Sequence, residues 1–149
     1  MMPATSQRVP LHTAAHVNAW IAAQTRDSVA WHARHPETID RRLEELDAEW
    51  DIERMLEANA ASVALAGLAL AAWVDRRWLA LPIGVAAFLL QHAIQGWCPP
   101  VEVFRRLGFR TAREIDEERY ALKALRGDFE GLGRADGGDA QAALAATRH

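Results

Sequence analysis

The sequence contains a single cysteine, a single tyrosine and four phenylalanines among 149 residues, although half of its residues are hydrophobic. One cysteine excludes an intramolecular disulfide and any metal site built from a cysteine cluster. Acidic residues outnumber basic ones, and the formal net charge of −3 argues against a nucleic-acid-binding protein. The first ten residues, MMPATSQRVP, lack the apolar core of a signal peptide, so we expect no export.

The chain instead has two long runs without charge. Residues 58–74, ANAASVALAGLALAAWV, form a run of 17, residues 78–101 form a run of 24, and only Asp75, Arg76 and Arg77 separate them. At ~1.5 Å per residue, a helix of this first length spans roughly 25 Å, just short of a hydrocarbon core of about 30 Å. Two adjacent runs around a charged turn favour a membrane hairpin. The alternative is that both runs pack in the core of a soluble helical bundle.

Tryptophans and arginines indicate how the hairpin is oriented. Trp73 and Trp78 flank the turn, and Trp50 and Trp97 lie near the opposite ends, where indole rings favour the headgroup level. Basic residues concentrate on the cytoplasmic side of short loops. We therefore predict a multi-pass membrane protein with both termini in the cytoplasm. The arginines near the outer ends are Arg41, Arg42, Arg54, Arg105, Arg106, Arg110 and Arg113.

Small residues recur on one face of each predicted span. Such stripes let two backbones approach closely, and in lipid this packing replaces the missing hydrophobic drive. We therefore expect the spans to pack on each other, and we expect Gly67→Leu or Gly84→Leu to disrupt assembly. The alternative is that alanine is simply common in this chain. The stripes are Ala60, Ala64, Gly67 and Ala71 on the first span, and Ala80, Gly84 and Ala87 on the second.

Polar side chains also gather near one end of the spans. They reach the same depth when the hairpin is folded about Arg76, and this predicts interhelical hydrogen bonds. An alternative interpretation makes His92 a proton-binding or metal-binding group beside Cys98, as intramembrane polar residues sometimes are. The predicted polar cluster consists of Asn59, Ser62, Gln91, His92 and Gln95.

The only cysteine lies in the stretch QGWCPP, residues 95–100. The two prolines end the second span near Trp97, which leaves Cys98 at the cytoplasmic interface on the last turn of a helix. A helix carboxyl end does not lower the pKa of a thiol. We therefore interpret Cys98 as a small interfacial residue, with a reactive thiol as the alternative.

The segments outside the hairpin divide into four regions. We expect residues 1–9 to be disordered, 10–57 to form a cytoplasmic helical region, 99–129 to form interfacial and cytoplasmic helices, and 130–149 to be a disordered tail. The hairpin itself occupies 58–98. His12 and His16 stand one helical turn apart, a weak signal for a metal site because no third ligand accompanies them.

Local patterns predict the helices of these regions. One helix is expected from about Pro10 to Arg34, and a second from about residue 37, with an apolar seam at Ile39, Leu43, Leu46 and Trp50. Thr111 and Glu114 form a capping box that begins another helix, and Gly127 is placed to end it. A short helix before that one has Val101, Phe104 and Leu107 on one face, with Arg105 and Arg106 expected against anionic headgroups.

Residues 50–115 resemble the YgaP-like small inner-membrane family. The resemblance rests on WDIERMLEANAASVALAGLAL with its Glu53–Arg54 pair, the short turn, and GWCPP followed by RRLGFRTAREI. It implies a two-helix hairpin in the bacterial inner membrane that serves as an anchor and dimerisation unit with cytoplasmic termini. In some members the hairpin follows a rhodanese sulfurtransferase domain, but the active-site loop of that domain has no counterpart around Cys98. Sulfurtransferase activity is therefore not implied for this chain.

Together these features predict an all-α membrane hairpin with flanking cytoplasmic helices. No nucleophile–base pair, phosphate-binding loop or pair of buried carboxylates is visible, which favours a non-enzymatic protein and leaves enzymatic activity open. No cofactor is expected. The expected partners are the lipid bilayer and either further copies of the chain or another membrane or cytoplasmic protein. The first alternative is a thiol or persulfide carrier that uses Cys98, and a weaker one is a metal or haem site that uses histidines.

Overall fold

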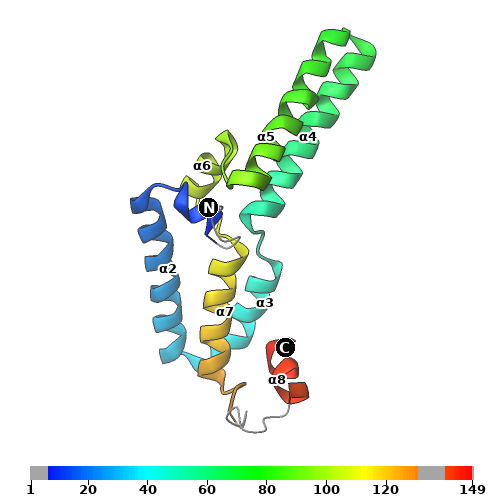
Figure 1. Cartoon of the computed structure of the whole chain (residues 1–149). Helices are drawn as coiled ribbons and strands as arrows, with labels where there is room; N and C mark the ends of the chain where they lie inside the picture. Colours follow the sequence, from blue (N-terminus) through cyan, green and yellow to red (C-terminus); the bar gives the residue numbers. More distant parts are fainter. Residues whose placement is uncertain (1–6, 131–139, 149) are drawn as a thin grey trace. The chain divides into compact units, whose positions relative to one another are not determined.

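A computed structural model describes residues 7–130 and 140–148 (Figure 1). Every regular element in these residues is a helix and none is a strand, which confirms the all-α prediction. The chain divides into two compact units, one made of Met1–Ala23 and Trp50–Ile115 and the other of Gln24–Glu49 and Asp116–His149.

The helices distribute over the two units as follows. The first unit contains α1 (Arg8–Leu11), α4 (Ile52–Trp73), η2 (Arg76–Leu79), α5 (Ala80–Gln95) and α6 (Pro99–Arg106). The second contains η1 (Pro36–Thr38), α3 (Ile39–Ala48) and α8 (Ala140–Arg148). Helices α2 (Ala15–Arg34) and α7 (Ala112–Arg126) each contribute residues to both units.

Helices α4 and α5 form the long hairpin of the first unit (Figure 1). The charged turn between them is stabilised by Asp75, whose side chain accepts a hydrogen bond from the backbone N–H of Arg77 at 2.7 Å. Pro82 lies in the first turn of α5, where its missing N–H costs little. The helix ends at Gln95 because Gly96 adopts a left-handed conformation with φ 77° and donates its N–H to the His92 carbonyl.

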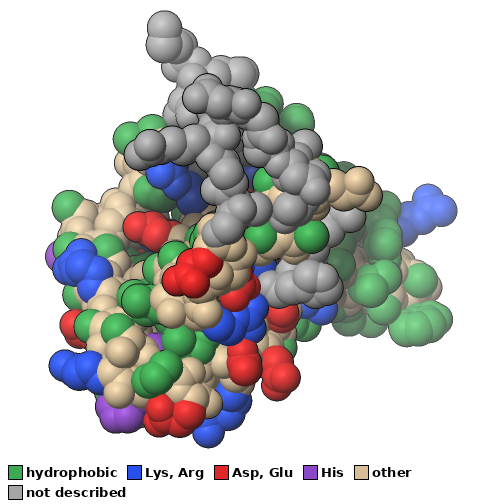
Figure 2. Space-filling view, turned by 90° about the horizontal axis from the view of Figure 1, so that it is seen from below, with side chains coloured by type: hydrophobic (Ala, Val, Ile, Leu, Met, Phe, Trp, Pro, Cys, Tyr) green, Lys and Arg blue, Asp and Glu red, His purple; other side chains and the backbone are tan. Residues whose placement is uncertain are grey.

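The outer surface of this hairpin is apolar and exposed. Large side chains such as Trp73, Leu65 and Ile83 keep 84%, 67% and 68% of their surface accessible. Two candidate membrane spans include these helices, and only 17% and 6% of their most apolar stretches are buried within the protein. A core helix of a soluble protein would be mostly buried. Figure 2 shows hydrophobic side chains over the visible part of the hairpin, whereas acidic and basic side chains mix on the other helices.

A small apolar core lies at the open end of the hairpin. Ile52 and Leu56 from the start of α4 pack with Val9, Cys98 and Val101, and all five side chains are at most 3% exposed. Phe104 and Phe109 pack against this cluster. The core joins α1, α4 and α6 into one unit.

Arg105 of α6 is fully buried in this unit, where the sequence had predicted contact with headgroups. Its guanidinium donates to both carboxylate oxygens of Glu114, at 2.6 and 2.8 Å, and to the Phe109 carbonyl at 3.0 Å. It also donates to Asn18 Oδ1 and Thr13 Oγ1, at 2.9 and 3.3 Å. Because every N–H of the guanidinium has an acceptor, the charge is tolerated inside the protein.

The three side chains that were predicted to form one apolar face of α6 differ in their burial. Val101 is buried and Phe104 is half-buried, but Leu107 is 67% exposed and lies just beyond the end of the helix. The prolines at 99 and 100 occupy the first turn of α6, so they begin a helix as well as following one.

Both predicted ends of α7 are confirmed. The Glu114 N–H donates to Thr111 Oγ1 at 3.3 Å and the Thr111 N–H donates to Glu114 Oε2 at 2.7 Å, which is the reciprocal pattern of a capping box. The helix ends at Arg126, and Gly127 follows with φ 93°. These bonds fix the position of Glu114, which also pairs with Arg105.

In the second unit α3 buries three of the four residues of its predicted seam, Ile39, Leu43 and Leu46. Trp50 lies outside α3 and is 41% exposed. The fully buried Glu118 of α7 accepts hydrogen bonds from Ser28 at 2.6 Å and from Arg42 at 2.9 and 3.2 Å. This network links α2, α3 and α7.

The predicted disordered ends differ in part from the structure. Residues 8–11 form α1, and residues 140–148 form α8. Gln7 and Glu130 lie in turns, and the remaining parts of those predictions, residues 1–6, 131–139 and 149, lie outside the described residues. The first predicted helix, 10–34, is divided into α1 and α2.

Candidate functional site

Three charged or polar side chains meet at the open end of the hairpin, where α4 begins and α5 ends. His92 of α5 places Nε2 2.9 Å from Glu53 Oε2 of α4. Arg8 of α1 donates to the other oxygen of that carboxylate, at 3.0 Å, and to the Ala93 carbonyl, also at 3.0 Å. Since an ionised carboxylate only accepts, Nε2 carries the proton in this contact. The contacts tie the start of α4 to the end of α5.

His92 is the only member of the predicted polar cluster that makes a hydrogen bond between α4 and α5 among the described residues, and its partner is Glu53. The Ser62 hydroxyl instead donates to the Ala58 carbonyl of its own helix, at 2.7 Å. Asn59 and Gln91 are half-buried and Gln95 is exposed. The carboxylate at residue 53 thus takes the place that the sequence interpretation gave to neutral polar groups.

Cys98 belongs to the apolar core and is 3% exposed. It is the N-cap residue of α6, whereas the sequence placed it on the last turn of the preceding helix. A helix amino terminus favours a thiolate, but burial raises the pKa of the Cys98 thiol, and the nearby Glu53 carboxylate adds to this effect. The geometry therefore holds the sulfur as a neutral thiol.

The small-residue stripes lie in different environments on the two helices. On α4, Ala60 and Gly67 are buried and Ala64 and Ala71 are half-buried. A Cβ added to Gly67 would lie 2.7 Å from Pro82 Cδ, so α5 approaches α4 closely there. On α5, a Cβ at Gly84 would meet no atom within 4 Å, and its stripe neighbours are exposed. Those neighbours are Ala80 and Ala87.

The predicted metal candidates His12 and His16 are both exposed. Within residues 7–130 and 140–148, no three or more His, Cys, Asp or Glu side chains are grouped closely enough to hold a metal ion. The structure therefore adds no ligand to this pair.

An apolar groove of about 180 Å³ opens between the hairpin helices next to Cys98. Asn59 is the one polar side chain in its lining, and Pro100 closes it on the side of α6. The groove is continuous with the exposed apolar surface of the hairpin. Its other lining residues are Leu56, Ala60 and Val63 of α4 and Val85, Phe88 and Leu89 of α5.

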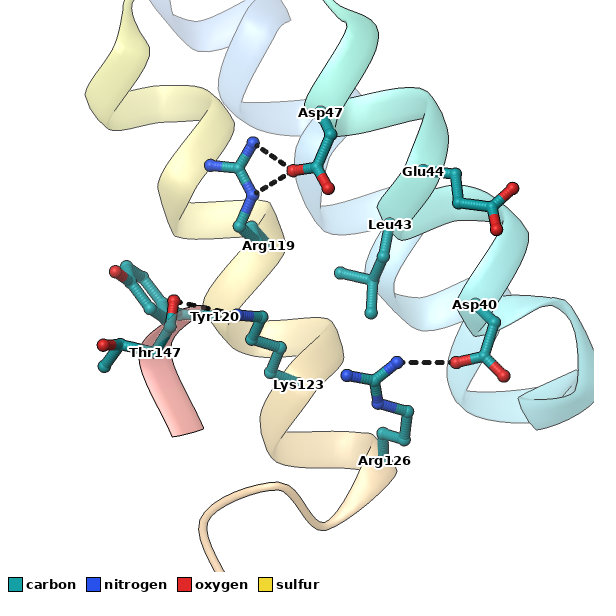
Figure 3. A pocket seen from close by; sticks show the side chains of 9 residues that line it. All are labelled: Asp40, Leu43, Glu44, Asp47, Arg119, Tyr120, Lys123, Arg126 and Thr147. Atoms are coloured by element: carbon teal, nitrogen blue, oxygen red, sulfur yellow. Dashed lines mark hydrogen bonds and ion pairs between the residues drawn. The ribbon is translucent and has the colours of Figure 1, made fainter. Parts of the chain in front are cut away.

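The second unit contains a larger, charged groove of about 550 Å³ (Figure 3). Acidic residues of α3 and basic residues of α7 each recur at i, i+4 and i+7, which places each set on one helix face. Leu43, Tyr120 and Thr147 complete the lining. The charged lining residues are Asp40, Glu44 and Asp47 on α3 and Arg119, Lys123 and Arg126 on α7.

The comparisons with known proteins bear on the first unit. A model of the family described as "Inner membrane protein YgaP-like, transmembrane domain" matches residues 51–114. This part of the chain belongs to the YgaP-like transmembrane family. No curated protein and no solved structure matches the chain. The family match and the two exposed apolar helices support a protein of the inner membrane with transmembrane helices, in which residues 51–114 are similar to the YgaP-like transmembrane domain.

The matched segment runs from the N-cap of α4 to the first turn of α7. It therefore includes Glu53, His92 and Cys98 but not Arg8, which completes the cluster at the open end of the hairpin. The sequence interpretation missed Arg8 because it placed this residue in a disordered segment. The motif pair Glu53–Arg54 was the available signal for the carboxylate, but nothing local connects it to His92.

Proposed function

We propose that this YgaP-like protein is a non-enzymatic membrane module. Its hairpin anchors the chain, pairs with a second copy, and carries the flanking helices on the cytoplasmic face for contact with a protein partner. The proposal rests on the α5 face around Gly84. A Cβ added to Gly84 would meet no atom within 4 Å, and its stripe neighbours are exposed, whereas the small residues of the α4 stripe are buried or half-buried within the hairpin. Close contact between such faces is a common basis of helix association in lipid.

We expect Gly84→Leu to reduce association between copies while leaving the hairpin intact, because its side chain would project from an open surface. Cysteine-independent cross-linking in native membranes would measure this, and the cross-linked fraction should fall severalfold. Ala86→Leu adds similar bulk at an exposed position of α5 outside the small-residue stripe and should leave the fraction unchanged. An unchanged fraction for Gly84→Leu would overturn pairing through this face.

The proposed orientation places both ends of the hairpin in the cytoplasm. The arginines near those ends support this orientation. With Cys98 replaced by serine, Leu11→Cys and Arg76→Cys would each provide one exposed thiol, since both native residues are exposed. A membrane-impermeant maleimide should label the Arg76→Cys variant in intact spheroplasts and the Leu11→Cys variant only in inverted vesicles. The opposite labelling pattern would show that the ends of the hairpin lie outside the cytoplasm.

Burial of the only thiol supports an anchor over a thiol carrier. Because burial raises the pKa of Cys98, the reactive thiolate is disfavoured at neutral pH and forms only as the pH rises above the ordinary range of a cysteine. We expect N-ethylmaleimide to modify Cys98 at pH 7 at least about 10-fold more slowly than an exposed thiol on the same helix. Val103→Cys in a Cys98→Ser background supplies that control, as Val103 is 56% exposed. Faster modification of Cys98 than of the control would favour the carrier.

A further inference from the structure

Lys123 is the only lysine in the chain, and the other 16 basic residues are all arginines. Its side chain lies in the charged groove of the second unit (Figure 3), and the residue is only 3% exposed. Lysine is almost never this buried unless its charge is paired. The question is therefore what balances this ammonium group.

The two arginines beside it on α7 are each fully paired with carboxylates. Arg119 contacts Asp47 at 3.0 Å and also Asp116. Arg126 contacts Asp40 at 2.6 Å and Asp128 at 2.5 Å. The acids of the groove therefore neutralise the first and last members of the basic stripe.

Lys123 has no such partner among the described residues. Its ammonium donates to the Thr147 carbonyl of α8 at 3.1 Å and lies 5.9 Å from the centre of the Tyr120 ring. Glu44 is the acidic residue of α3 nearest in register, but its side chain points away from Lys123 (Figure 3). An ammonium group has three donors. Among the described residues, one neutral acceptor and the face of one aromatic ring leave two donors without an acceptor and the charge without a carboxylate partner.

We propose that the charged groove binds a small organic oxyanion, either a carboxylate or a phosphate monoester. Its negative group accepts hydrogen bonds from Lys123 Nζ, and its apolar body lies against Leu43 and Tyr120. The volume of about 550 Å³ is in the range of small-molecule sites. A lysine suits this role because it presents a single point charge, whereas the neighbouring arginines are occupied by planar carboxylates.

The contact of Lys123 with α8 is the one that such a ligand would replace or share. A hydrogen bond between an ammonium and an ionised oxyanion is roughly twice as strong as one between neutral groups and is shorter. The Thr147 carbonyl carries only a partial negative charge and uses one of the three donors. An oxyanion therefore displaces this carbonyl or shares the ammonium with it.

The unique lysine makes the test direct. In the 149-residue chain in detergent micelles, ¹³C labelling of lysine at Cε alone yields one side-chain signal, which needs no assignment. Phenylacetate and phenyl phosphate should each shift this signal in a saturable manner, and the tighter of the two identifies the ligand class. Phenylacetamide, which has nearly the same shape but no charge, should bind at least about 10-fold more weakly than phenylacetate.

Calorimetric titration of two variants tests whether the charge of Lys123 is the one that binds the anion. Lys123→Met keeps most of the side-chain volume and should weaken binding by at least about 10-fold. Arg41→Met removes an equal charge from a 72% exposed side chain of α3 and should change nothing. Equal affinity in Lys123→Met, equal affinity for phenylacetamide, or no saturable shift with either anion would each overturn the proposal. The comparison of ligands on the native chain remains decisive if Lys123→Met does not fold.

Discussion

Replacing Arg105 by methionine is expected to lower the free energy of unfolding by about 3–5 kcal/mol. The substitution removes the fully buried guanidinium. It leaves the Glu114 carboxylate with only the Thr111 N–H as a donor and the Phe109 carbonyl without the guanidinium N–H that it accepts from. An uncompensated charge inside the protein costs more than the lost ion pair itself. Thermal unfolding in detergent micelles, followed by near-ultraviolet circular dichroism, would measure the loss.

The neighbouring Arg106 provides the matched control. Its side chain is 61% exposed and pairs with Glu102 at 2.5 Å, so Arg106→Met should change the stability by less than about 1 kcal/mol. Equal losses in the two variants would show that Arg105 contributes only a surface charge.

The same pair makes the stability depend on pH. Burial raises the pKa of Glu114, but hydrogen bonds from Arg105 and from Thr111 outweigh it and hold the pKa below its usual range. A lowered folded-state pKa contributes stability that is present above the unfolded value, about 4.3, and is lost as the pH falls through the folded value. The stability difference between the native protein and Arg105→Met should therefore narrow in acid below that pH.

Gly96→Ala is expected to destabilise the first unit by about 3 kcal/mol, for two reasons. At φ 77° a residue with a Cβ pays about 1–2 kcal/mol. In addition, the new Cβ would lie 2.6 Å from the carbonyl carbon of Arg8, so the backbone of α1 must move. That movement also disturbs the contacts of Arg8 with Glu53 and Ala93. Unfolding in micelles would measure the loss.

Gly127→Ala separates the two causes. Its φ of 93° carries a similar conformational penalty, but the nearest atom to an added Cβ lies at 3.4 Å, an ordinary contact distance. We therefore expect a loss of about 1 kcal/mol. If Gly96→Ala cost no more than Gly127→Ala, the close approach of α1 to the end of α5 would contribute nothing to stability.

The elements predicted correctly share a local origin. Two uncharged runs and the turn at Asp75–Arg77 indicated the hairpin, because the number of consecutive apolar residues decides whether a helix can cross a bilayer. Thr111, Glu114 and Gly127 indicated the ends of α7, because caps involve residues three or four positions apart. Such signals need no knowledge of the rest of the fold.

The residues of the candidate site could be predicted from such local signals only in part. His92 was singled out as a polar residue of the second span, yet its partner Glu53 lies 39 positions earlier in the sequence. Arg8 contacts Ala93 across 85 positions, and its segment had been expected to be disordered. Lys123 has no local feature that distinguishes it from the arginines around it, and only the groove shows that it is buried without a carboxylate partner.

The sequence by itself determined that this protein is helical, that it belongs in a membrane and where its hairpin turns, because those properties depend on composition over one helix length. Only the tertiary structure decided that Arg105 and Cys98 are buried rather than interfacial. A buried charge is stable only where distant residues supply all its partners, and a thiol is neutral only where an apolar core surrounds it. Both conditions arise from segments far apart in the chain, so no local pattern contains them.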